Sequence, residues 1–301
     1  MDFVVNGVVE LPQPGFFNET IIPFLMENNV IQSERIAANL HSIFYISIFY
    51  HLWFLFGTQI MFPKIANLLF DKKDETLTDK KKYNALMIQS GIHLVSFVQA
   101  IIVLYLSLKC MLYDEEYYQV YTDSFSRIFG SIRATEVICV YAIGYFVWDI
   151  YISSRYSELP FILHGIISTV VYVIGLKPSI QYYAPVFLMF ELSNPSLNIR
   201  WFLMKYFPNQ KSLLTANNLM LMVIFFFCRI AWGWLQIGKL CYDYYMTMDQ
   251  PGVNQLDTII IVGGNLVLDV LNIVWFRSML LAAIKVLKQK FVNKKENSKR
   301  D

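Results

Sequence analysis

The sequence contains few charged residues for its length. Asp, Glu, Lys and Arg make up 16% of the 301 residues, whereas hydrophobic residues make up 56%. Average soluble domains carry about 25% charged residues, which they need to cover their surface. The shortage of charge therefore argues against a soluble globular protein and favours a polytopic membrane protein with one membrane domain.

Other missing features exclude further classes of protein. The net charge is only +2, without a basic block interleaved with aromatic residues, so the sequence does not indicate nucleic-acid binding. The four cysteines are scattered and lack the spacing of a metal site, so no metal is predicted. The first residues have neither a basic region nor a long apolar run, so we expect no cleavable signal peptide.

The hydrophobic residues form runs long enough to cross a bilayer, which requires about 20 apolar residues per helix. Five segments meet this length, at residues 40–62, 85–108, 134–152, 219–240 and 258–284. Two shorter runs, 161–176 and 180–193, flank the turn "GLKPS". They form either two short helices or one hairpin inside the bundle, and we favour two helices. The sequence thus predicts an all-α polytopic membrane bundle with about seven transmembrane helices.

The connections between these segments alternate between basic and acidic. The loop after the first segment is rich in lysine, the loop 241–257 contains acids only, and the last residues are again basic. Because basic loops stay in the cytosol, segment 1–39 is predicted to be lumenal or extracellular and the tail 286–301 cytosolic. The transmembrane domain then spans 40–285, and Asn18 in "NET" is a candidate glycosylation site on the lumenal side.

Ionisable and amide side chains recur inside the apolar segments. Such a group costs about 2.5–3.5 kcal/mol at the bilayer centre, so it usually pairs, faces the bundle interior or serves a function. Three of them share one face of the last segment, at spacings of four and three residues. The candidates are His93, Asp149, His164, Glu191, Arg229, Asn265, Asp269 and Asn272.

Two interpretations of these residues are open. They can be contacts between helices, with Arg229 neutralised by a buried acid. The acids within reach are Asp149, Glu191 and Asp269. Alternatively, the residues surround one polar cavity that binds a lipid head group or a thioester. A single cavity around His164, the acids and Arg229 would favour the second interpretation, and separate dry pairs would favour the first. Because Pro195 follows Glu191 closely, we also expect it to end the helix at 180–193.

Several motifs occur in the order found in one protein family. They are "YNALMIQSGIHLVSFVQAIIV" (83–103), "AIGYFVWDIY" (142–151), "FILHGIIS" (161–168), "FLMFELSNPSLNIRWFL" (187–203), "FFFCRIAWG" (225–233) and "LNIVWF" (271–276). As an ordered set, they resemble the TLC (TRAM–LAG–CLN) domain family, in its branch of uncharacterised members. The resemblance implies a multi-spanning helical protein of the endoplasmic reticulum or connected membranes.

Ceramide synthases of this family join a fatty acyl-CoA to a sphingoid amine. Their first signature histidine falls on His164, whereas their second falls on Gly165. Of their later His-Asp-x-x-Asp pattern, one acid remains as Glu191, with Phe190 and Asn194 at the other positions. The comparison with the family therefore argues against a ceramide synthase of the usual mechanism.

Two functions are compatible with these observations. We favour a non-enzymatic protein that binds membrane lipids and influences sphingolipid or phospholipid composition. The alternative is an acyl-CoA-dependent lipid N-acyltransferase, in which a histidine acts as base beside two acids. Its catalytic residues would be His164, Asp149 and Glu191, and its substrate-binding residues His93, Arg229, Asn265, Asp269 and Asn272. We expect no cofactor, with acyl-CoA as a candidate substrate and membrane lipids as partners. The sequence leaves a homo-oligomer open.

Overall fold

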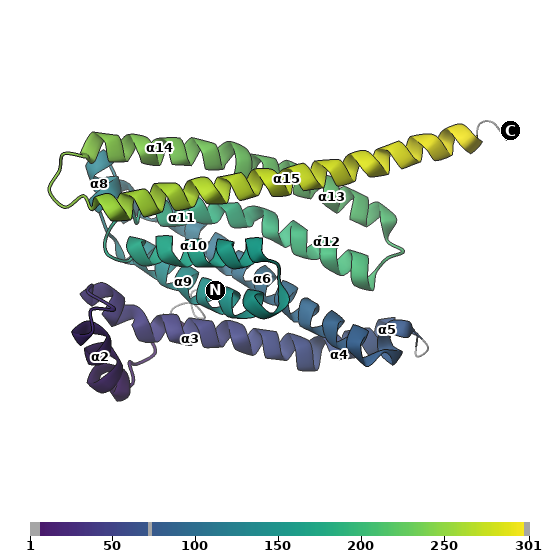
Figure 1. Cartoon of the computed structure of the whole chain (residues 1–301), viewed down its shortest axis with the longest axis horizontal. Helices are drawn as coiled ribbons and strands as arrows, with labels where there is room; N and C mark the ends of the chain where they lie inside the picture. Colours follow the sequence, from purple (N-terminus) through teal and green to yellow (C-terminus); the bar gives the residue numbers. More distant parts are fainter. Residues whose placement is uncertain (1–6, 72–73, 298–301) are drawn as a thin grey trace.

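A computed structural model describes residues 7–71 and 74–297, and this part of the chain folds into helices without a strand. The first six residues of the N-terminal segment and the last four of the basic tail lie outside the described ranges. The helices lie lengthwise in one elongated bundle, with α15 extending beyond its neighbours at one end (Figure 1). The predicted all-α membrane bundle is confirmed.

Five helical stretches in the described ranges are long and apolar enough to cross a membrane. They are Glu34–Leu69, Lys80–Tyr113, Arg133–Tyr156, Lys211–Thr247 and Gln255–Val286. In order, they contain α3 (Glu34–Phe56) with α4 (Phe62–Leu69), α6 (Lys80–Tyr113), α9 (Arg133–Tyr156), α13 (Lys211–Phe225) with α14 (Trp232–Thr247), and α15 (Gln255–Asn297). Short helices cover the connections, namely α2 (Ile22–Glu27), α5 (Glu75–Thr78), α7 (Glu115–Val120) and α8 (Ser124–Phe129).

The two shorter apolar runs form two separate helical segments that also lie along the bundle (Figure 1). The first is α10 (Leu159–Gly175), with 17 residues. The second is interrupted: α11 (Tyr183–Leu188) passes through a 3₁₀ turn at Met189–Ser193 into α12 (Asn194–Tyr206). With the five long stretches, these two account for the expected seven segments.

Pro195 does not end a helix, contrary to the expectation from sequence. It lies in the first turn of α12, and the helical path continues to Tyr206. A proline is tolerated at this position because the first N–H groups of a helix have no partner within it. The stretch after residue 193 is therefore helical and not a loop.

The outer surfaces of the long helices are apolar. Leu219 and Phe227 on α13 and its continuation are each 63% exposed, and Ile259 on α15 is 68% exposed. Water would not accommodate so many exposed large side chains, whereas lipid chains would. Inside the bundle, α3 and α9 approach closely at Gly144, where a Cβ atom would lie 2.6 Å from Ile46 Cγ2. Small residues allow such close helix contacts in membranes.

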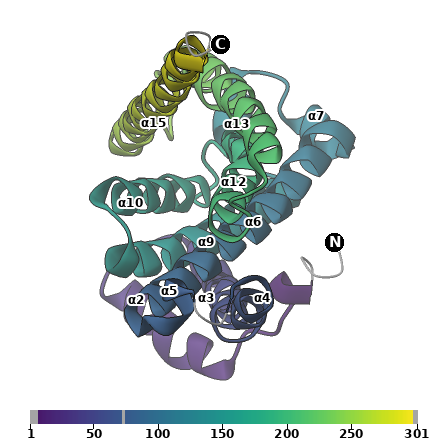
Figure 2. The same ribbon diagram turned by 90° about the vertical axis from the view of Figure 1, so that its right-hand side faces the viewer.

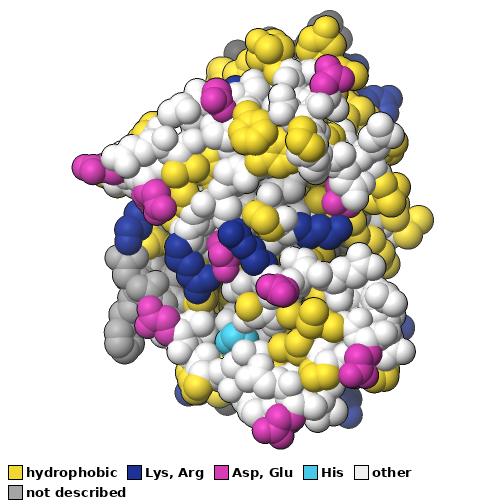
Figure 3. All heavy atoms as spheres, turned by 90° about the vertical axis from the view of Figure 1, so that its left-hand side faces the viewer, with side chains coloured by type: hydrophobic (Ala, Val, Ile, Leu, Met, Phe, Trp, Pro, Cys, Tyr) yellow, Lys and Arg dark blue, Asp and Glu magenta, His cyan; other side chains and the backbone are white. Residues whose placement is uncertain are grey.

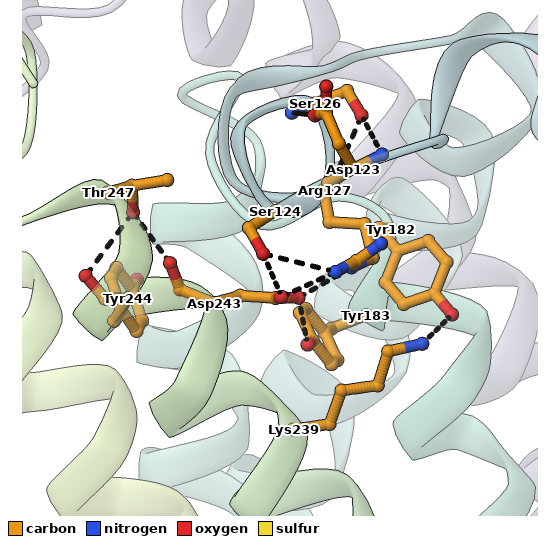
Figure 4. A network of polar contacts seen from close by, with 10 residues as sticks. All are labelled: Asp123, Ser124, Ser126, Arg127, Tyr182, Tyr183, Lys239, Asp243, Tyr244 and Thr247. Atoms are coloured by element: carbon orange, nitrogen blue, oxygen red, sulfur yellow. Dashed lines mark hydrogen bonds and ion pairs between the residues drawn. The ribbon is translucent and has the colours of Figure 1, made fainter.

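An ion-pair network joins α8 to α14 at the end of the bundle opposite the α15 extension. Figure 4 shows Asp243 directed toward Arg127 and Tyr183. Arg127 donates to both carboxylate oxygens at 2.6 Å, and the Tyr183 hydroxyl donates to Oδ2 at 2.6 Å. The bonds to Asp243 raise the pKa of Arg127 above its ordinary value. The sequence predicts Asp243 in the acidic loop 241–257, but α14 extends to Thr247 and Asp243 is completely buried.

The same end carries other paired charges. Basic and acidic side chains lie next to one another over the middle of this face (Figure 3). Lys177 pairs with Asp257 at 3.3 Å, and Arg133 with Glu136 at 2.7 Å. Asp123 begins α8 by accepting from the Ser126 backbone N–H at 2.7 Å, which lowers the pKa of the Asp123 carboxyl. These contacts fix the connections that cover this end of the bundle.

Replacing Asp243 by Asn should destabilise the protein strongly, because Arg127 would lose its buried counter-ion. Breaking such a pair costs about 3–5 kcal/mol. As a control, Asp257→Asn removes the more exposed pair with Lys177 and should cost at most about 1 kcal/mol. Thermal unfolding in detergent would compare the two variants, and equal shifts of the melting temperature would contradict the structural role of the buried pair.

Candidate functional site

Two charged residues at the centre of the bundle lie on turns that depart from regular α-helix. Glu191 belongs to the 3₁₀ turn between α11 and α12. Arg229 belongs to a π-helical turn, Phe226–Ala231, between α13 and α14. Irregular turns inside helices frequently occur at functional sites, because they redirect side chains and free backbone groups. Both turns bring their charged residue into the bundle interior, where each is almost completely buried.

Arg229 is bound by neutral acceptors on three sides. Its Nε donates to the Phe190 carbonyl oxygen at 3.1 Å and to Ser193 Oγ at 2.9 Å. The two terminal nitrogens donate to Asn272 Oδ1 at 3.2 Å and to Asn194 Oδ1 at 2.8 Å. In the described part of the chain, Arg229 forms no direct ion pair with a carboxylate. Its charge is therefore held by oriented dipoles.

Asn194 connects Arg229 to Glu191. Its Nδ2 donates to Glu191 Oε2 while its Oδ1 accepts from Arg229. The two charges thus interact through one amide, whose orientation is fixed because the guanidinium can only donate and the carboxylate accepts. The second oxygen of Glu191 has no hydrogen bond among the described residues, so it can accept one from a ligand.

A narrow cavity of about 50 Å³ lies beside this pair, between α9, α10, α11 and α15. Most of its walls are apolar and aromatic, including Phe146, Phe187 and Leu188. The polar groups that line it are few and converge from different helices. They are His164, Ser168, Tyr172, Tyr183, Glu191, Arg229 and Asn265. Such a pocket, apolar with a few placed polar groups, is typical of a small-molecule or lipid site.

His164 lines this cavity from α10. Its ring contacts Phe146 and Trp275 edge to face, with centroids 5.7 and 6.0 Å away. In the described residues, no side chain or backbone group forms a hydrogen bond with the ring nitrogens. His164 is therefore positioned by aromatic packing, and its nitrogens are available to a ligand. No carboxylate orients the imidazole as in a catalytic pair.

Asp149 lies close to the cavity but is not part of its lining. Its Oδ1 accepts from Ser153 Oγ at 3.3 Å, one turn further along α9. On α10, the position of Gly165 brings the backbone close: a Cβ there would lie 3.3 Å from Asp149 Oδ2. Gly165, which occupies the position of the second signature histidine, thus allows α10 to pack against Asp149.

The polar face predicted on α15 faces the bundle interior. Three of its residues are at most 4% exposed, namely Asn265, Asp269 and Asn272. Asn265 lines the cavity and Asn272 binds Arg229, whereas Asp269 lies against α14, where a Cβ on Gly233 would be 2.9 Å from its Oδ1. Asp269 Oδ2 is buried without a hydrogen-bond partner in the described part of the chain.

Two predicted residues lie elsewhere. His93 on α6 shares a hydrogen bond with Asn198 Oδ1 at 2.7 Å and stacks on Trp201 with centroids 4.4 Å apart. This separate cluster links α6 to α12 and does not line the cavity. Asn18 is exposed on the helical turn Phe17–Ile21, so its side chain is accessible.

Some important residues were not identified from the sequence as site residues. Asn194 and Ser193 hold the central charges, and Asn198 binds His93. These three lie close together in "LSNPSLN", a polar stretch within an apolar region. Neutral amide and hydroxyl side chains carry no charge that would mark them as costly in a membrane. Only the density of polar residues in this stretch could have indicated their role.

Comparison with known proteins agrees with this architecture. The model of the TLC domain matches residues 89–281, about two thirds of the chain. The chain belongs to the TLC domain family. An uncharacterised TLC domain-containing protein of Saccharomyces cerevisiae is 56% identical over 95% of this chain and 96% of its own.

More distant relatives also align over most of their lengths. Topoisomerase I damage affected protein 4 of the same yeast is 30% identical, covering 85% of this chain and 88% of its own. Human TLC domain-containing protein 4 is 28% identical, and the alignment covers 84% of this chain and 92% of the human protein. No solved structure matches the chain.

Replacing Asn194 by Leu should remove the amide that links Glu191 to Arg229, while the volume of the side chain stays nearly the same. Each buried charged group would lose one hydrogen bond, at about 1.5–3 kcal/mol each, so we expect a marked fall in melting temperature. Asn28→Leu, which removes an exposed bond to Phe24, is the control and should have little effect. If Asn194→Leu were as stable as this control, Asn194 would not connect the two charges.

Proposed function

We propose that this TLC-domain protein binds a membrane lipid in its interior cavity and thereby takes part in maintaining membrane lipid composition. The observation that carries the proposal is the convergence of His164, Glu191 and Arg229 on one largely apolar cavity. This is the arrangement that favours a ligand site over separate helix contacts. The family to which the chain belongs supports a role in the membrane.

The free polar atoms indicate which kind of head group fits. Arg229 already directs three of its five N–H groups at neutral protein acceptors, which partly compensate its charge. Glu191 retains one free oxygen, and the nitrogens of His164 have no partner among the described residues. The Glu191 oxygen and one ring nitrogen of a neutral His164 accept hydrogen bonds from hydroxyl, amide or amine groups, and the other ring nitrogen donates. The cavity therefore suits a lipid with a donor-rich head group, such as a sphingoid or ceramide-like lipid.

The proposed cellular setting follows the charge pattern of the connections. Lysines dominate the connection after α4 and the end of α15, and both lie at the same end of the bundle (Figure 1). Under the positive-inside rule, this end faces the cytosol and the α8 end faces the lumen. We propose the endoplasmic reticulum as the membrane, with the N-terminus lumenal.

A second candidate function is acyl transfer from acyl-CoA to a lipid amine. It is favoured by one observation: His164 and Glu191, a base and a carboxylate, line the same cavity. In this mechanism, His164 would remove the proton from the amine as it attacks the thioester carbonyl, and the thiol of coenzyme A would leave. The absence of an orienting hydrogen bond to His164 makes the binding function the better supported one.

Purified protein should carry a specific lipid, and filling the cavity should remove it. Ser168→Phe places a large ring into the cavity from α10, whereas Val170→Phe adds the same ring on the exposed face of that helix. Mass spectrometry of lipid extracts should show the bound lipid in the wild type and in Val170→Phe, and several-fold less in Ser168→Phe. Equal lipid content in all three proteins, or no specific lipid in the wild type, would contradict the proposal.

The acyltransferase candidate has its own test. In reconstituted membranes with an acyl-CoA and a sphingoid amine, His164→Ala should lower product formation by at least about 10²-fold, the usual contribution of a general base. The matched control is His93→Ala, because His93 lies outside the cavity. Unchanged turnover in His164→Ala, or no turnover by the wild type, would reject this mechanism without affecting lipid binding.

A further inference from the structure

A second cavity lies among α12, α13 and α15. Figure 2 shows these helices from the end of the bundle at which α15 extends. This cavity is a groove of about 440 Å³, separate from the interior cavity and sharing no lining residue with it. Its walls are mainly aliphatic, from Leu197, Leu219, Leu221, Met222, Met279, Ala282, Ala283 and Val286. Leu219 is 63% exposed, so the groove opens toward the membrane side of the bundle.

One positive charge faces this apolar groove. Arg200 projects from α12 into the lining and forms no hydrogen bond or ion pair with any described residue. The hydroxyls in the lining are occupied within their own helices: Thr215 donates to the Lys211 carbonyl at 2.8 Å, and Ser278 to the Val274 carbonyl at 2.9 Å. No carboxylate lines the groove. The lining also contains Asn218, whose buried Oδ1 has no hydrogen-bond partner in the described part of the chain. The guanidinium therefore lacks an anionic partner among the described residues.

The sequence around the groove increases this positive charge. No acidic residue occurs between Glu191 and Asp243, a stretch that contains α12 and α13, or between Asp269 and Glu296 on α15. The same stretches contain basic residues that do not line the groove: Lys205, Lys211, Arg277 and Lys285. The local field thus favours an anion at the mouth of an apolar groove.

We infer that this groove binds a phosphate-bearing anionic lipid, with the phosphate on Arg200 and an acyl chain along the aliphatic walls. A guanidinium presents paired N–H donors that match two phosphate oxygens. The aliphatic walls and the opening toward the membrane require the anion to carry a chain, because a soluble phosphate compound would leave them uncovered. The site differs in chemistry from the interior cavity, which offers hydrogen-bond acceptors, so it goes beyond the function proposed above.

The test measures lipid binding by native mass spectrometry of the full chain in a neutral detergent. Phosphatidic acid or phosphatidylglycerol should bind, whereas diacylglycerol, which lacks the phosphate, should not. Arg200→Gln should lower the binding of the anionic lipid about tenfold or more, corresponding to the loss of a charge-assisted hydrogen-bond pair. Arg277→Gln removes the same charge from α15 outside the groove. It lowers the local field but removes no phosphate contact, so it should weaken binding clearly less than Arg200→Gln does.

A second variant tests the groove without changing its charge. Ala283→Phe adds a ring to the aliphatic wall and should also weaken binding of the anionic lipid, while Arg200 remains. Equal losses in Arg200→Gln and Arg277→Gln would show a general charge effect and overturn the proposal. Competition by water-soluble glycerol phosphate as effective as that of the lipid would also overturn it. Ser168→Phe, which fills the interior cavity, should leave binding of the anionic lipid to the groove unchanged. A failure of the proposed interior lipid site can therefore be told apart from a failure of the groove site.

Discussion

The buried guanidinium of Arg229 is the constraint around which the interior is organised. A charge at this depth is tolerated only if several acceptors surround it. Backbone and side-chain oxygens from the 3₁₀ turn, α12 and α15 supply them, at 2.8–3.2 Å. Arg229 thus holds the segment 190–194 and α15, which are far apart in the sequence, at one point. Both of them also border the adjoining cavity.

The irregular turns are part of the same arrangement. In a regular α-helix the carbonyl of each interior residue already accepts one backbone hydrogen bond, so a second donor such as Arg229 must share it. The 3₁₀ turn at Met189–Ser193 changes the bonding pattern at the point where the Phe190 carbonyl accepts from Arg229. Irregular backbone occurs at membrane depth where it is enclosed by protein or lines a cavity, and both conditions hold at Glu191.

The sequence predicted the fold better than the site, for a physical reason. Apolar runs of about 20 residues are long, repetitive signals, and they located the five long helices and the two short segments. Contacts within the bundle depend on helix rotation and on turns such as the one near Pro195, which the sequence does not specify. Thus His164, Glu191, Arg229 and Asn265, which the sequence groups by their cost in a membrane, line one cavity, whereas His93 meets the same criterion and lies in another cluster.

The two cavities offer different polar groups to a ligand. Inside the bundle, neutral dipoles surround Arg229, and the polar groups left for a ligand are one oxygen of Glu191 and the ring nitrogens of His164. In the outer groove, no described residue forms a hydrogen bond or ion pair with Arg200. Two arginines on neighbouring helical segments therefore differ in role because of their surroundings alone. A protein with both sites could respond to two lipids of different charge, since occupation of one cavity need not compete for the groups that form the other.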